Sequence, residues 1–349
     1  MAARVAFIAP FAFPSVRGNA ITVERIARGL RARGVDLRVW DVSVVPEAAV
    51  EQQVGQFAPT LIHAFHAFRT GPLALRLARC GEIPLILTIT GTDANYDLFD
   101  PERAAVVRRV LEGAASITVF DQSIAVRIAQ ALPDVIARVV VVPQSVSLEA
   151  GDPAWPTAIA LRRAPGPILL FSAGIRPVKN PRYPLAPLDG LVGKYPTLEL
   201  IYVGPILDPQ EGEALLRELG SRRWARHLGA IPHARMRPLL EASDIALNCS
   251  LSEGGMANSV LEALALGRPV LASNIEGNRS LVEDGVTGFL FGSPEEFADK
   301  CDRLLGDPAL RERLGEAGRE RVNARFSPAH ELDGYLAVYG RLTPTLRPA

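Results

Sequence analysis

The sequence predicts an α/β protein made of two Rossmann-like domains, each with a parallel sheet. Short apolar, β-branched runs alternate with helical patterns over most of the chain. Strands that are apolar on both faces and interleaved with helices are typical of parallel sheets covered on both sides. The length of 349 residues, 48% of them hydrophobic, favours two globular domains, each large enough for its own core.

The apolar runs fall into two sets. The first set of expected strands is Val5–Ala9, Val35–Val39, Leu61–Phe65, Pro84–Thr90, Ser116–Phe120 and Val139–Val142. The second set is Ile168–Ala173, Leu198–Val203, Asp244–Ser250, Pro269–Ser273 and Gly288–Phe291. Between them, Ser147–Gly166 is rich in Pro, Ala and Arg without a clear period, which indicates a linker. We therefore expect domains at 1–150 and 165–327, the first completed by a C-terminal helix at 328–342.

Two helices can be placed from their patterns. Val23, Ile26, Ala27 and Leu30 form one apolar stripe of a helix that begins after Arg17-Gly18-Asn19. Arg31 and Arg33 suit its last turn, and Gly34 suits a left-handed C-cap. The final helix, Pro328–Leu342, is also striped with apolar residues, and Ser327 precedes it as an expected N-cap.

Composition excludes several classes of function. Lys plus Arg equals Asp plus Glu at 38 each, so no bulk charge favours nucleic acid or an anionic membrane. No apolar run reaches the length of a membrane span. The N-terminal apolar run is broken by Pro10 and Pro14, which favours a buried strand over a signal peptide. The three scattered cysteines (Cys80, Cys249 and Cys301) are read as core residues in a reducing compartment, and we expect a cytoplasmic protein.

The most informative stretch runs from Ser252 to Phe291. It places Glu253, the pair Gly254-Gly255, a helix start at Asn258 or Ser259, and Glu262 in close succession. A glycine-opened helix N-terminus binds anions, because unpaired N–H groups and the helix dipole point at the same place. Two carboxylates beside a phosphate site favour a bound polyol, so the stretch predicts a nucleotide-sugar pocket. The structural alternative is a capping box formed by Ser259 and Glu262.

Further polar groups follow other expected strands. Arg176 and Lys179 come directly after Ile168–Ala173 and suit a diphosphate, although a solvated surface pair is the alternative. His63 and His66 end one strand, and Thr90-Gly91-Thr92-Asp93 end the next. An i, i+3 histidine pair could bind metal, but no third ligand is evident, so metal is set aside. The GxGxxG fingerprint is absent, which disfavours an NAD-binding domain.

With these residues, the chain resembles the retaining glycosyltransferases of family 4, which have the GT-B fold of two facing Rossmann-like domains with a cleft between them. The resemblance implies that Glu253 contacts the donor sugar, that Glu262 binds the ribose, and that Arg176 and Lys179 hold the diphosphate. It implies donor contacts from the first loop and from the glycine loop with its helix start. The residues concerned are Gly18, Asn19, Gly254, Gly255, Met256, Asn258 and Ser259. A metal-independent retaining transfer from a nucleoside-diphosphate sugar, with a UDP-sugar as the expected donor, follows from the resemblance.

Three departures from the family pattern stand out. Eight residues separate Glu253 from Glu262, one more than the family motif has, which requires a bulge at Gly254-Gly255. Arg176 and Lys179 lie closer together than in many members. The histidine that often precedes Gly-Thr-Asp is Thr90 here, and His66 is the candidate to replace it as a catalytic residue.

Two narrower groups share some of these departures. The glycosyltransferase 1 domain-containing proteins look similar in Arg-x-x-Lys-x-Pro and in the C-terminal motifs. The selenosugar synthases of selenoneine biosynthesis look similar in Gly18-Asn19, Thr90-Gly91-Thr92-Asp93, Gln144-Ser145 and Glu253-Gly254-Gly255. The first group is preferred, because its C-terminal match is longer. The acceptor therefore stays open between an ordinary hydroxyl and a selenium or sulfur nucleophile, and a GT-B protein that binds nucleotide without catalysis is a third hypothesis. The sequence does not indicate an oligomeric state.

Overall fold

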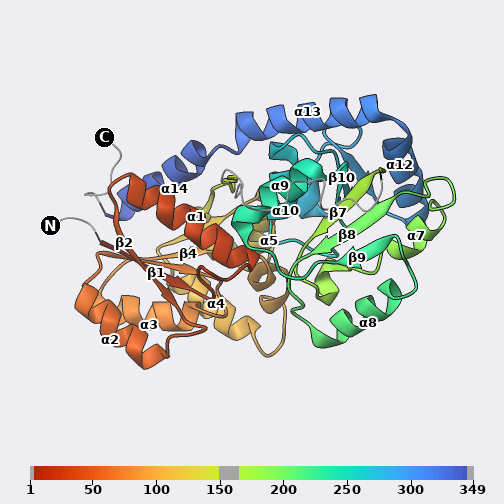
Figure 1. Cartoon of the computed structure of the whole chain (residues 1–349). Coiled ribbons are helices and arrows are strands. Elements are labelled where there is room, and N and C mark those ends of the chain that lie inside the picture. The colour runs from red at the N-terminus through yellow and green to blue at the C-terminus, as the bar shows by residue number, and fades with distance from the viewer. Residues whose placement is uncertain (1–3, 149–164, 344–349) are drawn as a thin grey trace. The chain divides into compact units, whose positions relative to one another are not determined.

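The computed structural model describes residues 4–148 and 165–343, drawn in Figure 1. The chain divides into two compact units, Met1–Ser145 with Ser327–Ala349, and Val146–Phe326. Most of the expected linker Ser147–Gly166 lies outside the described residues. Each unit is an α/β structure around one parallel sheet of six strands, so the predicted fold class is confirmed.

The sheet of the first unit has the order β2-β1-β3-β4-β5-β6, and all its pairs are parallel. Its strands are β1 (Arg4–Ala9), β2 (Asp36–Asp41), β3 (Leu61–Phe65), β4 (Leu85–Thr88), β5 (Ser116–Val119) and β6 (Val139–Val141). The residues of β3, β4 and β5 are all buried, because helices cover both faces.

Two helical layers enclose this sheet. The helical segments are α1 (Gly18–Ala32), α2 (Glu47–Phe57), α3 (Gly71–Gly81), η1 (Asp93–Asp97), α4 (Ala104–Gly113), α5 (Gln122–Ala131), η2 (Pro133–Arg138) and α14 (Pro328–Leu342). Helices α1 and α14 pack against one face through a core that includes Ile26, Phe65 and Tyr339. Helices α2, α3, α4 and α5 pack against the other face. The last helix of the chain thus belongs to the first unit.

The sheet of the second unit has the order β12-β11-β10-β7-β8-β9, again with parallel pairs. Its strands are β7 (Ile168–Ser172), β8 (Glu199–Val203), β9 (Ala225–His227), β10 (Ile245–Asn248), β11 (Val270–Ser273) and β12 (Phe289–Phe291). Its helical segments are η3 (Pro177–Lys179), α7 (Leu185–Asp189), α8 (Pro209–Leu219), η4 (His233–Arg235), α9 (Met236–Ala242), α10 (Asn258–Ala265), α11 (Glu276–Arg279), α12 (Pro294–Gly306) and α13 (Pro308–Arg325).

Most of the local expectations for α1 and α14 are confirmed. The stripe Val23, Ile26, Ala27 and Leu30 is buried, and Gly34 has the expected left-handed φ of 82°. Arg33 is the C-cap of α1 and lies outside its last turn. Helix α14 spans the predicted residues, and the Ser327 hydroxyl accepts a hydrogen bond from the His330 amide at 3.3 Å.

Two expectations were wrong. Strand β9 was missed, because it has only three residues and carries Arg226 and His227 in place of an apolar run. Cys80 is exposed near the end of α3, whereas Cys249 and Cys301 are buried in the core as predicted. All three thiols are free.

Candidate functional site

Each sheet has one point at which the strand order reverses, and the predicted site residues follow the strands at these points. In the second unit the reversal lies between β7 and β10, and in the first between β1 and β3. Loops leaving the carboxyl ends of two such strands diverge toward opposite faces, which opens a crevice where α/β proteins bind ligands. Arg176 and Lys179 follow β7, and Glu253 follows β10.

Lys179 and Glu253 form the centre of the second-unit site. The Lys179 ammonium donates to Oε1 of Glu253 at 2.5 Å, and the two side chains are 16% and 8% exposed. The same oxygen accepts from the Ser250 hydroxyl at 2.6 Å and from the Asn248 amide at 3.1 Å. Glu253 is therefore the counterion that holds Lys179 in place. Two sequence-predicted residues, 74 positions apart, are in direct contact.

The ionisation of Glu253 follows from these contacts. Burial raises the pKa of the Glu253 carboxyl, but the charge of Lys179 and the hydrogen bonds from Lys179, Ser250 and Asn248 together lower it below its usual value. The carboxylate is thus charged at neutral pH.

The loop that carries Glu253 rests on the turn that follows β11. Gly255 has a φ of 118°, a backbone conformation that favours glycine and matches the bulge expected from the extra residue in the motif. A Cβ on Gly277 would lie 2.4 Å from the Gly255 carbonyl oxygen and 2.7 Å from Cβ of Glu253. Nearby, the buried Asn278 amide donates to Asn248 Oδ1 at 3.2 Å and to the Ser273 carbonyl at 2.9 Å. Gly277 and Asn278 thus pack against the acidic loop, the segment Ser252–Gly255 that carries Glu253, and against Asn248 at its base.

Arg176 lies near the start of the loop that follows β7. It is partly buried and precedes η3, and the amide of Lys179 donates to its carbonyl at 3.0 Å. The amide of Leu251 donates to the carbonyl of Val178 at 2.9 Å, which fastens the β7 loop to the β10 loop. The backbone of the Arg176–Lys179 segment is therefore fixed beside the loop that follows β10.

The start of α10 corrects one expectation. Its N-cap is Ala257, which has extended backbone angles and makes no side-chain capping hydrogen bond. Asn258 and Ser259 lie inside the first turn, so neither caps the helix and the Ser259–Glu262 capping box is not formed. The loop approaches the helix through Met256 and Ala257, both buried, and this shifts the first helical residue toward the N-terminus.

Glu262 has a partner that sequence reasoning missed. Nε2 of His233, in the turn η4, lies 2.8 Å from Oε1 of Glu262, and the side chains are 21% and 9% exposed. Oε2 of Glu262 accepts no hydrogen bond from the residues that the structure describes. Because β9 was not recognised, the following Gly229–His233 loop was not identified as a carboxyl-edge loop. Asn248 was also missed, although it is the polar residue at the end of an otherwise apolar strand.

In the first unit, the loops after β1 and β4 come together. The Asn19 amide donates to the Thr90 hydroxyl at 3.4 Å, and Gly18 opens helix α1 beside it. Asp93 joins the β3 and β4 loops, because its carboxylate accepts from the backbone amides of Ala67 at 2.9 Å and Gly91 at 2.7 Å.

His66 lies at the centre of these loops. It is 2% exposed, and its φ of 81° is a strained conformation for a residue other than glycine. Its Nε2 is 2.9 Å from the Thr92 hydroxyl and 3.8 Å from Oδ2 of Asp97, while Nδ1 is 3.9 Å from Oδ2 of Asp93. The ring thus braces the β4 loop between two carboxylates. His63, by contrast, is fully buried between Tyr339 and Thr88, and burial lowers its pKa to about 3, so it is a neutral core residue.

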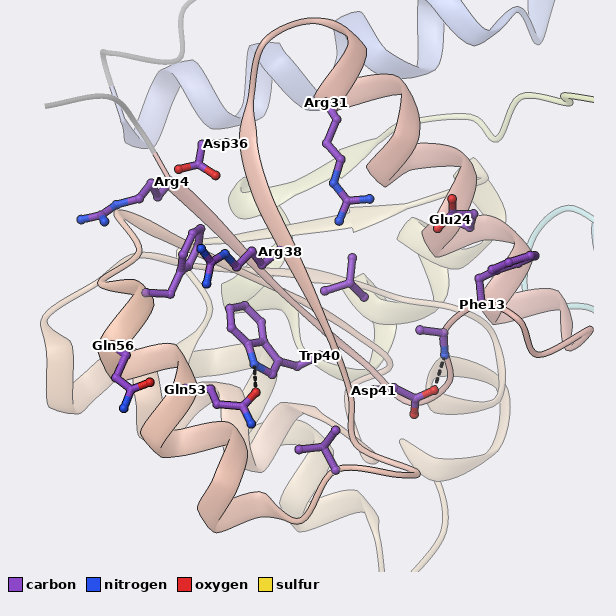
Figure 2. Close-up of a pocket in the computed structure, with 14 residues that line it drawn as sticks. Arg4, Phe13, Glu24, Arg31, Asp36, Arg38, Trp40, Asp41, Gln53 and Gln56 are labelled. Atoms are coloured by element: carbon purple, nitrogen blue, oxygen red, sulfur yellow. Dashed lines mark hydrogen bonds between the residues drawn. The ribbon is translucent and has the colours of Figure 1, made fainter.

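An open groove of about 820 Å³ runs along the edge strand β2 and contains none of the predicted site residues. Figure 2 shows Arg31 reaching from α1 toward this edge and the Trp40 indole donating to Gln53 at 2.9 Å. Arg31 donates to the Leu37 carbonyl at 3.1 Å, and Arg38 lies 4.7 Å from the Phe57 ring centroid. The Arg31 guanidinium thus pairs with a backbone carbonyl of the edge strand β2.

The described residues contain neither a metal-binding cluster nor a helix that could span a membrane. No group of three or more His, Cys, Asp or Glu side chains in 4–148 and 165–343 is arranged to hold a metal ion. Within the same ranges, no helix has the length and apolar character needed to cross a membrane.

The fold matches solved structures over nearly its whole length. Sucrose-phosphate synthase from Thermosynechococcus elongatus superposes with a TM-score of 0.83 at 20% identity, covering 98% of this chain and 99% of that one. HepE from Anabaena, in complex with UDP and glucose, superposes with a TM-score of 0.80 at 18% identity, covering 97% and 100%. The two parallel six-stranded sheets are those of the GT-B fold.

Sequence relatives place the chain within this fold class. The model of the glycosyl transferases group 1 family matches residues 159–321. D-inositol 3-phosphate glycosyltransferase of Frankia alni is 30% identical over 285 residues, covering 74% of this chain and 69% of the relative. Glycosyltransferase 1 domain-containing protein 1 of Xenopus tropicalis is 28% identical over 330 residues, covering 91% and 92%. The chain belongs to the group 1 glycosyltransferases.

Proposed function

We propose that the protein is a metal-independent, retaining glycosyltransferase that transfers a sugar from a UDP-sugar to an acceptor. The observation that carries the proposal is the Lys179–Glu253 pair at the reversal point of the second sheet. Arg176 lies in the same loop as Lys179, and Glu262 lies on α10, the helix that follows the Glu253 loop. The choice of UDP is supported by the structurally similar HepE, whose structures contain UDP and UDP-glucose.

The two cations hold the diphosphate. The Lys179 ammonium has three N–H groups, and Glu253 is its only hydrogen-bond partner among the described residues. The remaining N–H groups are available to phosphate oxygens. Arg176 adds a planar fork that binds two phosphate oxygens. When the bond between the sugar C1 and the diphosphate oxygen breaks, both cations stabilise the negative charge on the leaving group.

The carboxylates have different tasks in this proposal. Glu253 positions Lys179 and lies on the sugar side, while Glu262 binds the ribose hydroxyls through Oε2. No side chain is assigned as a nucleophile. The acceptor attacks the same face from which the diphosphate leaves, and a phosphate oxygen takes the acceptor proton. We assign acceptor binding to the first unit. At its reversal point, Gly18 and Asn19 contact the donor, and His66 is the candidate catalytic residue.

The test is turnover of UDP-glucose in the wild type and in Arg176→Ala and Glu262→Ala, with melting temperature as the control for folding. Loss of one such contact typically slows the reaction by about 10²-fold or more. Variants that fold normally and turn over the donor at the wild-type rate would remove the assignment. Binding of UDP without any turnover by the wild type would instead favour a non-catalytic nucleotide-binding protein.

A further inference from the structure

His233 is the one side chain that directly contacts Glu262 through a hydrogen bond among the described residues. The two residues come from distant parts of the second unit, since η4 follows the edge strand β9 and α10 follows the central strand β10. Strands β7 and β8 lie between β9 and β10 in the sheet. The histidine therefore reaches along the carboxyl edge to one particular carboxylate.

The loop that carries His233 is well anchored. Ile231 and Met236, on either side of it, are 7% and 6% exposed, and the Arg235 amide donates to the Pro232 carbonyl at 2.9 Å. An ionised carboxylate only accepts hydrogen bonds, so Nε2 of His233 carries the hydrogen in this contact. The ring thus fixes the position of Oε1 and, through the planar carboxylate, the direction of Oε2.

We propose that His233 is the positioning residue of the ribose subsite, which holds the Glu262 carboxylate so that Oε2 faces a ribose hydroxyl. This inference rests on the proposed function, because it takes the ligand of Glu262 to be a ribose. A glutamate without this contact samples several rotamers, and ordering it on binding weakens the affinity. Because His233 already orders the Glu262 side chain in the free protein, that ordering does not weaken the affinity for the nucleotide. The protein then distinguishes ribose from deoxyribose nucleotides more sharply than Glu262 alone would allow.

The experiment measures dissociation constants of UDP and of 2′,3′-dideoxy-UDP by calorimetry. The proteins are the wild type, Glu262→Gln, His233→Ala, His233→Gln and His330→Ala. We expect the wild type to bind UDP about tenfold or more tighter than the dideoxy analogue, as the loss of a charged hydrogen bond implies. His233→Ala should weaken UDP severalfold while leaving the analogue within twofold of the wild type. His233→Gln keeps an N–H donor and should restore most of the preference.

His330 is the matched control, because it is an exposed histidine on α14 of the first unit, and His330→Ala should leave both constants unchanged. Equal weakening of both ligands by His233→Ala would overturn the inference, because it would indicate a role in the fold or at the base. If Glu262→Gln changes the ribose preference but His233→Ala keeps that of the wild type, the inference about His233 is overturned. The ribose assignment of Glu262 then stands. A wild type that binds both ligands equally would remove the ribose assignment of Glu262 and the inference with it.

Discussion

At the scale of single residues, the candidate site depends on the ion pair between Lys179 and Glu253. Lys179 and Glu253 are both largely shielded from water, so removal of one leaves a poorly solvated charge. We expect Glu253→Gln to lower the free energy of unfolding by about 3 kcal/mol at neutral pH, the usual cost of breaking such a pair.

The same variant tests the ionisation of Glu253. Because the folded-state pKa lies below the usual value of 4.5, the unfolded chain takes up the proton first as the pH falls. The stability that Glu253 contributes is therefore present above pH 4.5 and disappears as the pH falls through the lowered pKa. Melting curves of the wild type and Glu253→Gln from pH 7 to pH 3.5 should converge at the acid end. A gap that stays constant would show that the pKa of Glu253 is the same in the folded and unfolded chain, which contradicts the lowered pKa.

Gly277 gives a second prediction at this scale. Alanine usually stabilises a helical position relative to glycine, but here the new Cβ would meet the backbone of Gly255 and the Cβ of Glu253. We expect Gly277→Ala to cost about 1–3 kcal/mol, as overpacking does, and to weaken UDP binding, because the acidic loop must move.

Gly55 provides the control for Gly277. It lies in the exposed part of α2, and nothing stands within 4 Å of a Cβ added there. Gly55→Ala should raise the free energy of unfolding by about 0.5–1 kcal/mol and leave UDP affinity unchanged. A stabilised Gly277→Ala with normal UDP affinity would mean that the turn after β11 does not support the Glu253 loop.

At the scale of elements, one buried carboxylate fastens the last helix to the first unit. Glu331 on α14 is 1% exposed and accepts from Arg25 of α1 at 2.7 Å and 2.9 Å, and from the Ser145 hydroxyl at 2.6 Å. Residues 145 and 327 are where the chain leaves and re-enters this unit. The network thus ties the two points at which the chain leaves and re-enters this unit to α1.

We expect Glu331→Gln to destabilise the protein by about 3–5 kcal/mol, because it breaks a buried ion pair whose side chains are 9% and 1% exposed. The control is Asp333→Asn on the same helix, where the pair with Arg33 is exposed at 63% and 30% of the two side chains. That change should cost less than about 1 kcal/mol. Denaturant unfolding compares the two variants, and similar losses in both would contradict the structural role of Glu331.

The elements show where sequence reasoning works and where it fails. Long apolar strands and striped helices were predictable, since burial on both faces leaves a continuous pattern, as in β3 and α1. Strand β9 was not, because an edge strand of three residues needs little apolar surface and pairs mainly through its backbone. The missed strand also hid His233, whose contact with Glu262 joins positions 29 apart and leaves no periodic signal.

The site itself was predictable in part. The residues that follow β7 and β10 were identified because parallel strands place such loops at one sheet edge. The partner of each side chain was not predictable: that Lys179 pairs with Glu253, and that Ala257 replaces Asn258 or Ser259 as the N-cap, depends on how the loops pack in three dimensions.

At the scale of the whole molecule, each of the two units carries its own set of candidate site residues. The second unit carries the cations and carboxylates proposed for the donor. The first carries Asn19, also proposed for the donor, and the strained His66 proposed for catalysis. Arg176 and Glu253 follow the two strands at the reversal point of the second sheet, and Gly18 and His66 follow those of the first.

The central claim is that the reversal point of the second sheet binds a nucleoside diphosphate through Arg176 and Lys179. Calorimetric titration of the wild type and Arg176→Gln with UDP and with uridine tests it most directly. The account predicts that the wild type binds UDP about 100-fold tighter than uridine, and that Arg176→Gln reduces this ratio about tenfold with uridine affinity unchanged. Equal affinity of the wild type for UDP and uridine would contradict it.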